Sequence, residues 1–317
     1  MWNGLHPNHL HKVASLNIID HILSTPDILQ RYQEPYKLNF RKTPSFADVM
    51  EDLKSHTIFL NCMTGDRSNI DLLTFLQGWE AMRDNADPTE YSPYAAVDVV
   101  SQPGKGLSHC VSEVPEQLQR DDVVIREEGG SDRLSSLVTP GGSTTVPRVD
   151  GYGSGQVLCV TYGVKLLLFW DWSEELMLFL DNHATEIERA AKTLEGMSWS
   201  ILTPGEYLLL SPGEVYAAMS PINSVMTGWT FVLPQWLMEG TIEKLMTWEL
   251  NDIEKRIIDG SSTHAERVKQ IEIELKMWNA WRSKRGLSQE MKNELQQLKK
   301  KIEARVNKLK KNLGKAK

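Results

Sequence analysis

The feature that most restricts the fold of this 317-residue chain is a series of short, β-rich segments between residues 134 and 233. The segments read LSSLVTP, STTVPRVD, GQVLCVTY, VKLLLFWD, WSILTP, EYLLLSP, EVYAAMS and SVMTGWTFV. Turns rich in glycine and proline, such as TPGG, GYGSG and SPG, separate them, and one helical pattern at about 182–194 interrupts the series. Parallel strands need long crossover connections, so many short strands joined by tight turns favour an antiparallel barrel or sandwich.

Helical patterns flank this series on both sides. In the N-terminal part we expect helices at 9–33, 45–55 and 69–82, a short strand at 57–62, and a loop-rich stretch with several prolines from 84 to 130. In the C-terminal part we expect helices at about 235–259, 264–282 and 287–312.

The sequence therefore predicts an α+β fold in three parts. They are a helical or mixed N-terminal part (1–130) that packs on the barrel, a β-barrel core (131–234), and a C-terminal helical region (235–317) with a basic last helix.

Charge is distributed unevenly along the chain. The net charge of −7 argues against non-specific nucleic-acid binding by the chain as a whole, but residues 288–317 contain nine Lys and one Arg against three Glu. This segment also carries an apolar stripe of Met291, Leu295, Leu298, Ile302, Val306 and Leu309. The stripe is typical of helix packing or a short coiled coil, which would permit a homodimer through residues 288–313. The lysines fit either a solvated helix face or contact with nucleic acid.

The three cysteines, Cys62, Cys110 and Cys159, are odd in number, widely spaced and without a CxxC pair. This pattern fits neither a disulfide framework nor a cysteine zinc site, and it favours a reducing compartment. The first residues lack the profile of a signal peptide, and acidic residues interrupt the most apolar run, at 164–180. We therefore expect a nuclear or cytoplasmic protein that does not enter a membrane.

Two stretches of the β-rich region resemble the halves of a known domain. TTVPRVDGYGSGQVLCVTYGVKLLLFWDW, which begins at Thr144, resembles the first half of the JmjC (Jumonji C) domain, and LTPGEYLLLSPGEVYAAMS, which begins at Leu202, resembles the second. The segment order, the spacing and the Pro-Gly turns agree across residues 134–233. The resemblance implies a double-stranded β-helix, the jelly-roll barrel of the cupins, in which family members hold Fe(II) and 2-oxoglutarate.

The resemblance also assigns site positions to this chain. The iron-binding His-x-Asp/Glu motif of the family reads Arg148-Val149-Asp150 here, and its distal His reads Tyr216. Lys165 and Thr145 fall where the family places the lysine and the hydroxyl that hold the far carboxylate of 2-oxoglutarate.

The changes at the iron positions alter what they can bind. An Fe(II) oxygenase of this kind needs two His and one carboxylate on one face of the metal. A guanidinium has no lone pair to give and repels a dication, so we expect Arg148 to pair with Asp150. Tyr216 could ligate iron only as a phenolate. His183, in the expected helical insert, is either a substitute ligand beside Asp150 or a surface histidine.

Lys165 has two interpretations at this stage. It lies inside an otherwise apolar strand, and a lysine there is costly to bury unless an anion accompanies it. It therefore either binds an anion inside the barrel or reaches solvent from the end of the strand.

We therefore expect a JmjC-like protein without oxygenase activity, which needs no cofactor and acts as a binding or regulatory module for a protein partner. By resemblance its setting would be nuclear and linked to chromatin. The alternative is an active 2-oxoglutarate-dependent protein hydroxylase or histone lysine demethylase with Fe(II) in an atypical shell. Two further hypotheses are a metal-free sensor that holds a dicarboxylate at Lys165, Thr145 and Arg148, and a barrel that only supports functional C-terminal helices.

Overall fold

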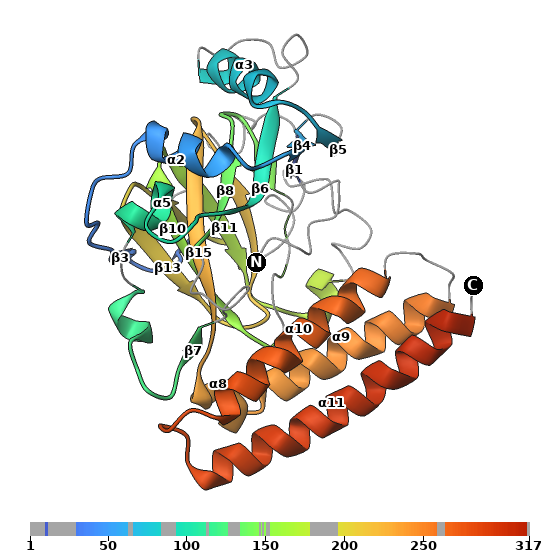
Figure 1. The fold of residues 1–317 in the computed structure, drawn as a ribbon. Helices are drawn as coiled ribbons and strands as arrows, with labels where there is room; N and C mark the ends of the chain where they lie inside the picture. The colour runs from blue at the N-terminus through green and yellow to red at the C-terminus, as the bar shows by residue number, and fades with distance from the viewer. Residues whose placement is uncertain are drawn as a thin grey trace.

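The computed structural model describes residues 10–11, 30–62, 66–83, 93–111, 114–125, 134–145, 147, 149, 153–177, 196–258 and 264–315. Two β-sheets lie at the centre of this part of the chain, and helices pack around them (Figure 1). The strands pair antiparallel, apart from β2 with β12. The α+β class predicted from the sequence is confirmed.

The larger sheet has nine described strands, eight of them in the order β3-β13-β10-β15-β8-β6-β4-β5, with β7 paired to β15. Their bounds are β3 (Tyr36–Lys37), β4 (Ile58–Asn61), β5 (Arg67–Asn69), β6 (Tyr94–Val100), β7 (Val124–Ile125), β8 (Ser135–Thr139), β10 (Gly155–Tyr162), β13 (Glu206–Leu210) and β15 (Ser224–Val232). The N-terminal part of the chain thus contributes strands to the same sheet as the β-rich region.

The smaller sheet has six described strands in the order β1-β9-β14-β11-β12-β2. Their bounds are β1 (Leu10–His11), β2 (Gln30–Arg31), β9 (Thr144–Thr145), β11 (Lys165–Trp170), β12 (Ser198–Leu202) and β14 (Val215–Met219). All eight β-rich segments of the sequence therefore contain strands, β8 to β15. Consecutive strands of this series lie in opposite sheets, except for β11 and β12, which are neighbours in the smaller one.

Three tight turns meet at one end of the two sheets. They are residues 140–143 between β8 and β9, 163–164 between β10 and β11, and 220–223 between β14 and β15. The Gly142 N–H donates to the Ser220 carbonyl at 2.7 Å, which joins the first turn to the third. Gly163 has φ +73°, and a Cβ there would lie 2.1 Å from the Asn223 carbonyl oxygen, so only glycine allows this close approach.

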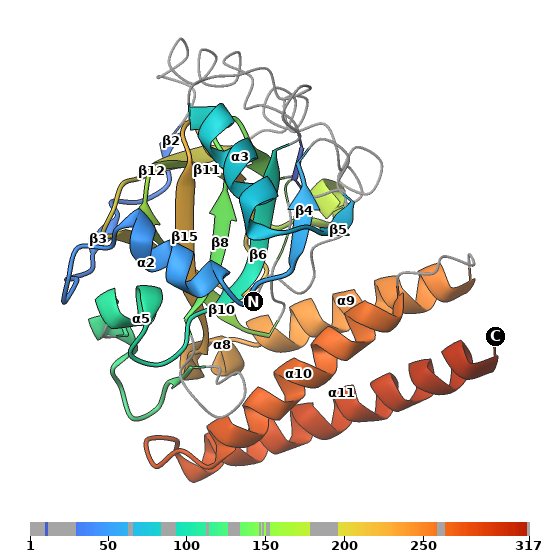
Figure 2. The same cartoon turned by 45° about the horizontal axis from the view of Figure 1, so that its top comes forward.

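Helices from the N-terminal part cover the outer face of the larger sheet (Figure 2). Helices α2 (Phe46–Leu53) and α3 (Leu72–Arg83) both pack against β6, and α5 (Gly106–Cys110) packs against α2. The helices predicted at 45–55 and 69–82 and the strand predicted at 57–62 are confirmed.

The stretch predicted to be loop-rich, 84–130, instead contains β6, α5, the 3₁₀ turn η1 (Glu116–Leu118) and β7. Pro93 and Pro103 do not interrupt the β6 strand but stand on either side of it, where a missing N–H does no harm. The prolines therefore mark the limits of a strand that the prediction missed.

The helix predicted at 9–33 is wrong at both places where the structure describes it. Residues 10–11 and 30–31 form β1 and β2, which pair with the edges of the smaller sheet. Edge strands with open hydrogen-bonding groups override a weak local helix propensity. The helical insert predicted at 182–194 lies outside the described residues.

Four described helices follow the last strand: α8 (Pro234–Met238), α9 (Thr241–Ile258), α10 (His264–Arg282) and α11 (Gln289–Lys315). The last three lie side by side beneath the sheets (Figures 1 and 2). The single helix predicted at 235–259 is divided at Gly240, whose φ of +73° a right-handed helix does not accommodate. The helices predicted at 264–282 and 287–312 are confirmed as α10 and α11.

The apolar stripe of α11 is buried inside this chain. Leu295, Ile302, Val306 and Leu309 are at most 2% exposed, and α11 packs on α8, α9 and α10. A homodimer through residues 288–313 would therefore have to use another face of the helix.

Many basic side chains of α11 form ion pairs. The pairs are Lys299–Glu303, Lys301–Glu243, Arg305–Glu254, Lys308–Glu254 and Lys310–Glu272. Four of these five pairs join α11 to α9 or α10, so much of the basic charge of the last helix faces acidic groups on its neighbours.

Candidate functional site

The space between the two sheets is the candidate site, and the pairing of strands determines which side chains face it. Directly opposed residues on antiparallel strands lie on the same face, and the face alternates along each strand. Lys165, on the smaller sheet, hydrogen-bonds Thr139 on the larger sheet. The faces that carry these two residues therefore face each other across the interior.

Lys165 lies at the end of the interior where the three turns meet. The residue is 1% exposed, and its Nζ donates to Thr139 Oγ1 and to Ser220 Oγ, each at 2.6 Å. The two hydroxyls are 2.9 Å apart, and Ser224 Oγ lies 3.2 Å from Thr139 Oγ1. A buried ammonium thus lies within a cluster of hydroxyls contributed by β8, β15 and the end of β14. Lys165 does not reach solvent from the strand end.

The charge of Lys165 also affects the pKa of the neighbouring Cys62 thiol. Burial raises the pKa of Cys62 to about 12, although a hydrogen bond from Ser143 and the charge of Lys165 act in the opposite direction. Ser143 Oγ lies 3.7 Å from Cys62 Sγ. The thiol therefore stays protonated and is a neutral neighbour of the cluster, not a nucleophile.

An aromatic layer lies four positions further along β11. Phe169 is paired directly with Tyr216 across β11 and β14, and their ring centroids are 6.5 Å apart. Tyr32, which follows β2, stacks on Phe169 with centroids 4.0 Å apart. Phe169 and Tyr216 are each 1% exposed. The position that the resemblance assigns to the distal iron ligand is therefore part of a packed layer of rings.

Two acidic side chains border this aromatic layer. Burial raises the pKa of Tyr32, and the negative charge of Glu214, to which Tyr32 is hydrogen-bonded, raises it further. Burial also raises the pKa of Glu214, which the hydrogen bond from Tyr32 offsets only in part. Asp171 adds a smaller repulsion to both groups. The Tyr32 phenol therefore stays neutral and acts as a hydrogen-bond donor.

The residues at the positions that the resemblance assigns to iron do not suit Fe(II). A buried phenol packed among rings is a poor ligand for Fe(II), and an arginine offers no lone pair at all. Within the residues that the structure describes, no three His, Cys, Asp or Glu side chains gather as metal ligands would. Arg148, Asp150 and His183 lie outside these residues, so the predicted Arg148–Asp150 pair and the substitute ligand His183 stay predictions.

The resemblance assigns Thr145 and Lys165 to one carboxylate site, but their side chains contact different groups in the structure. The Thr145 hydroxyl accepts the backbone N–H of Ala218 at 2.7 Å, and it thereby joins β9 to β14. The hydroxyls that contact Lys165 belong to Thr139 and Ser220, which the sequence did not single out. The TPGG turn and the SP turn that follow these two residues were the available signal, because such turns bring strand ends together.

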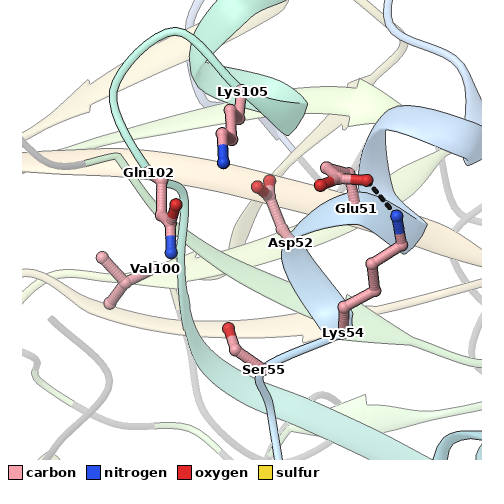
Figure 3. Close-up of a pocket in the computed structure, with 7 residues that line it drawn as sticks. All are labelled: Glu51, Asp52, Lys54, Ser55, Val100, Gln102 and Lys105. Atoms are coloured by element: carbon pink, nitrogen blue, oxygen red, sulfur yellow. Dashed lines mark hydrogen bonds and ion pairs between the residues drawn. The ribbon is translucent and has the colours of Figure 1, made fainter.

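A small cavity of about 130 Å³ lies on the outer side of the larger sheet, between α2 and the segment that leads into α5 (Figure 3). Asp52 is 6% exposed and accepts hydrogen bonds from Ser101 Oγ at 2.6 Å and from the Leu107 N–H at 3.0 Å. The other side chains that line it are Glu51, Lys54, Ser55, Val100, Gln102 and Lys105. Its charges are mixed, and its one buried carboxylate already holds α2 to α5, so we assign it a structural role.

Comparison with models of known protein families gives no match for this chain, and comparison with curated proteins gives no relative. None of the described helices is long and apolar enough to cross a membrane. The chemistry of the residues between the two sheets is therefore the basis for a functional proposal.

Proposed function

We propose that this chain is a JmjC-like double-stranded β-helix that binds a small carboxylate in its interior and does not catalyse oxidation. The strand order supports the fold assignment. Strands β8, β15, β10 and β13 are neighbours in one sheet, and β9, β14, β11 and β12 are neighbours in the other. Eight strands that alternate in this way between two facing sheets are typical of a jelly roll.

The observation that carries the binding proposal is the buried lysine. The ammonium of Lys165 lies between the sheets with the hydroxyls of Thr139 and Ser220 around it. One of these two hydroxyls donates its proton to the other at 2.9 Å, so the proton of the second is the one that the pair can still donate. The cluster therefore combines a positive charge with O–H donors, and a carboxylate needs both when it leaves water.

The donor set at the iron positions supports a module without oxygenase chemistry. Arg148 would bring a positive charge to the place where a dication has to bind, and Tyr216 packs against Phe169. On this proposal the protein needs neither Fe(II) nor any other cofactor, and ligand binding regulates a protein partner. By resemblance the setting is nuclear. The ion pairs of α11 favour a protein over a nucleic acid as that partner, because four of its nine basic side chains already pair with acidic groups of α9 and α10.

The proposal is tested by titration calorimetry on the full chain in the presence of a chelator. We expect 2-oxoglutarate and succinate to bind without metal, and succinamide, the uncharged counterpart of succinate, not to bind. Lys165→Met keeps the length of the side chain but removes the charge, and it should weaken binding about 10- to 100-fold, as expected for a hydrogen bond to a charged group. Lys300→Met, at an exposed position of α11, is the control and should bind like the parent protein.

A matched pair of variants protects the test against loss of folding. Thr139→Ser keeps the hydroxyl beside Lys165, whereas Thr139→Val keeps the shape and removes the hydroxyl. We expect the serine variant to retain binding and the valine variant to lose about tenfold in affinity. The binding proposal is wrong if no carboxylate binds at millimolar concentration, or if Lys165→Met binds as tightly as the parent protein.

Two measurements on the same sample distinguish the proposed binding module from an active oxygenase. An active oxygenase would hold Fe(II) or Mn(II) in stoichiometric amount and would convert 2-oxoglutarate to succinate, and Asp150→Ala would abolish this turnover. We expect no stoichiometric metal after incubation and only background succinate. Turnover that disappears in Asp150→Ala would overturn the proposal in favour of the enzyme.

A further inference from the structure

The cavity between α2 and the segment that leads into α5 contains a carboxylate whose structural role uses only one of its two oxygens. Both hydrogen bonds to Asp52, from Ser101 Oγ and from the Leu107 N–H, end on Oδ2. Oδ1 accepts no hydrogen bond from the residues that the structure describes, and it is exposed to the cavity that Asp52 lines. Carboxylate oxygens in a largely buried residue need donors, so Oδ1 can hold a donor that enters the cavity.

The electrostatics around Asp52 favour a positively charged donor. Burial raises the pKa of Asp52, and hydrogen bonds from Ser101 and Leu107 offset this only in part. The negative charges of Asp48 and Glu51, on the same helix, raise the pKa further. A cation beside Oδ1 would stabilise the ionised carboxylate against these effects.

A lysine that lines the same cavity supplies the opposite charge. Lys105 directly precedes α5, and Figure 3 shows its ammonium and the Asp52 carboxylate directed into the same space. Among the seven described side chains that line the cavity, the only ion pair is Glu51–Lys54 (Figure 3). Asp52 and Lys105 therefore face one cavity with opposite charges that do not pair with each other.

The size and the lining of the cavity limit the ligand further. Its volume of about 130 Å³ is close to that of an engineered cavity of about 150 Å³ that admits benzene, so it has room for a molecule of about six heavy atoms. Val100 is the one apolar residue in the lining, and Ser55 and Gln102 offer neutral polar groups. A fitting ligand is thus small, polar at both ends and at most slightly apolar between them.

We infer that this cavity binds the zwitterion of a small α-amino acid such as alanine, with the ammonium at Asp52 Oδ1 and the carboxylate at Lys105 Nζ. One such molecule satisfies both unpaired charges, because each of its ends forms a charge-assisted hydrogen bond. A divalent cation fits less well, since the two lysines of the lining repel it. The inference goes beyond the proposed function, because this cavity lies outside the larger sheet and Lys165 lies between the sheets.

The test compares two ligands of equal size that differ in one charge. L-alanine and L-alaninamide share the ammonium and the methyl group, but only alanine carries a carboxylate. Titration calorimetry on the full chain should show alanine binding about tenfold more tightly, which is the value of a hydrogen bond to a charged group. Lys105→Met keeps the length of the side chain and removes the charge, so it should weaken alanine binding alone and bring the two affinities together. Lys300→Met, at an exposed position of α11, is the control and should keep the ratio of the parent protein.

The ammonium end is tested with Asp52→Asn. The amide oxygen of this variant can still accept from Ser101 and Leu107, whereas its NH₂ group takes the place of Oδ1 and meets the ligand ammonium as a second donor. We expect both ligands to lose about tenfold or more in affinity. Urea unfolding checks that the variant is folded. Lys105 is exposed, so Lys105→Met gives a result even if Asp52→Asn does not fold.

Three outcomes would overturn the inference. They are equal affinities of the parent protein for alanine and alaninamide, a ratio that Lys105→Met leaves unchanged, and no binding of alanine at millimolar concentration. Lys165→Met separates this site from the proposed one, because it should bind alanine like the parent protein. Alanine binding that Lys165→Met removes and Lys105→Met keeps would belong to the space between the sheets and would also contradict the inference. Failure at the outer cavity leaves the proposed carboxylate site at Lys165 unaffected.

Discussion

Single residues determine how each end of the interior between the two sheets is filled. The ammonium of Lys165 lies among hydroxyls at one end, whereas Phe169, four positions along the same strand, packs against Tyr32 and Tyr216 at the other. Tyr32 is the only one of the three that is not fully enclosed, and it is held by its stacking on Phe169 and its hydrogen bond to Glu214.

The raised pKa of Glu214 predicts that the free energy of unfolding depends on pH. Burial raises the pKa of Glu214 above its ordinary value of 4.5, so the folded protein binds this proton more tightly than the unfolded chain. This contribution to stability is complete below about pH 4.5 and is lost as the pH rises through the pKa of the folded state. Glu214→Gln cannot ionise and should escape that loss. Urea unfolding from about pH 4 to pH 8 should show the variant gaining on the parent protein as the pH rises.

The control for this prediction is Glu239→Gln, which changes an exposed glutamate. Its stability relative to the parent protein should not vary across the same range. A constant difference between Glu214→Gln and the parent protein would contradict a raised pKa at Glu214.

Two glycines before and at the start of α5 provide a second prediction for single residues. Gly104 and Gly106 have φ of +73° and +51°, so an alanine is strained at either position. A Cβ on Gly104 would meet nothing within 4 Å, whereas a Cβ on Gly106 would lie 1.9 Å from Asp52 Oδ1. We expect Gly104→Ala to lower the unfolding free energy by about 1 kcal/mol, from backbone strain alone.

Gly106→Ala should lower the unfolding free energy by about 2 to 4 kcal/mol, because it also displaces the Asp52 carboxylate from Ser101 and Leu107. Chemical unfolding measures both values. Equal losses for the two variants would mean that the contact between Asp52 and α5 contributes nothing to stability.

Lys165 and its two hydroxyl partners show how much of the site could be predicted from the sequence. Lys165 could be found because a lysine is unusual within VKLLLFW, but the sequence left open whether it is buried. Its partners Thr139 and Ser220 are 26 and 55 residues away, and they become neighbours only because three turns meet at one end of the sheets. Hydroxyl residues at strand ends are too common to be selected before this pairing is known.

At the scale of elements, strand pairing decided where sequence patterns succeeded and where they failed. The segments β8 to β15 were predicted because β-branched and apolar runs alternated with strong turns. The pattern at 9–33 was helical, yet 10–11 and 30–31 are strands that extend the smaller sheet at its two edges. Such short strands have almost no sequence signal of their own, because the partner supplies the hydrogen bonds.

The capping box at the start of α2 predicts a second pH dependence. Burial alone would raise the pKa of Asp48, but hydrogen bonds from Lys42 and Ser45 outweigh it and hold the pKa at about 2. Asp48 Oδ2 accepts the Ser45 N–H at 2.9 Å and the Ser45 Oγ at 2.7 Å, and this fixes the start of the helix. The stabilisation is present above about pH 4 and should be lost as the pH falls toward 2.

Asp48→Asn should therefore lower the unfolding free energy by about 1 kcal/mol at pH 7 and should make little difference at pH 2. Stabilisation by Asp48 is thus lost as the pH falls, whereas stabilisation by Glu214 is lost as the pH rises. Urea unfolding at both pH values checks it, with Ala47→Ser, at an exposed position of the same helix that carries no ionisable group, as the control. A loss of equal size at both pH values would show that the ionised carboxylate is not the stabilising group.

At the scale of the whole molecule, the C-terminal helices pack on one another and, through α10, on the larger sheet. Helix α11 packs on α8, α9 and α10, and α10 in turn contacts β7. Between α9 and α10, Arg267 binds Glu249 through two hydrogen bonds of 2.7 and 2.6 Å and lies 2.8 Å from Asp252. Acidic groups on α9 and α10 also pair with the basic side chains of α11, which explains why an acidic chain ends in a basic helix.

This arrangement predicts that the stripe of α11 supports the fold and not a dimer. Ile302 is fully buried between α11 and the other helices, so Ile302→Ala should lower the unfolding free energy by about 2 to 4 kcal/mol. Lys300→Ala, on the exposed side of the same helix, should change it by less than about 0.5 kcal/mol.

If the stripe instead formed a dimer in solution, the loss caused by Ile302→Ala would depend on protein concentration, because dissociation is coupled to unfolding in a dimer. We expect the unfolding midpoints of the parent protein and of Ile302→Ala to be independent of concentration. We also expect sedimentation of the parent protein to give a monomer, since the apolar surface that an α11 dimer would use is already covered by α8, α9 and α10.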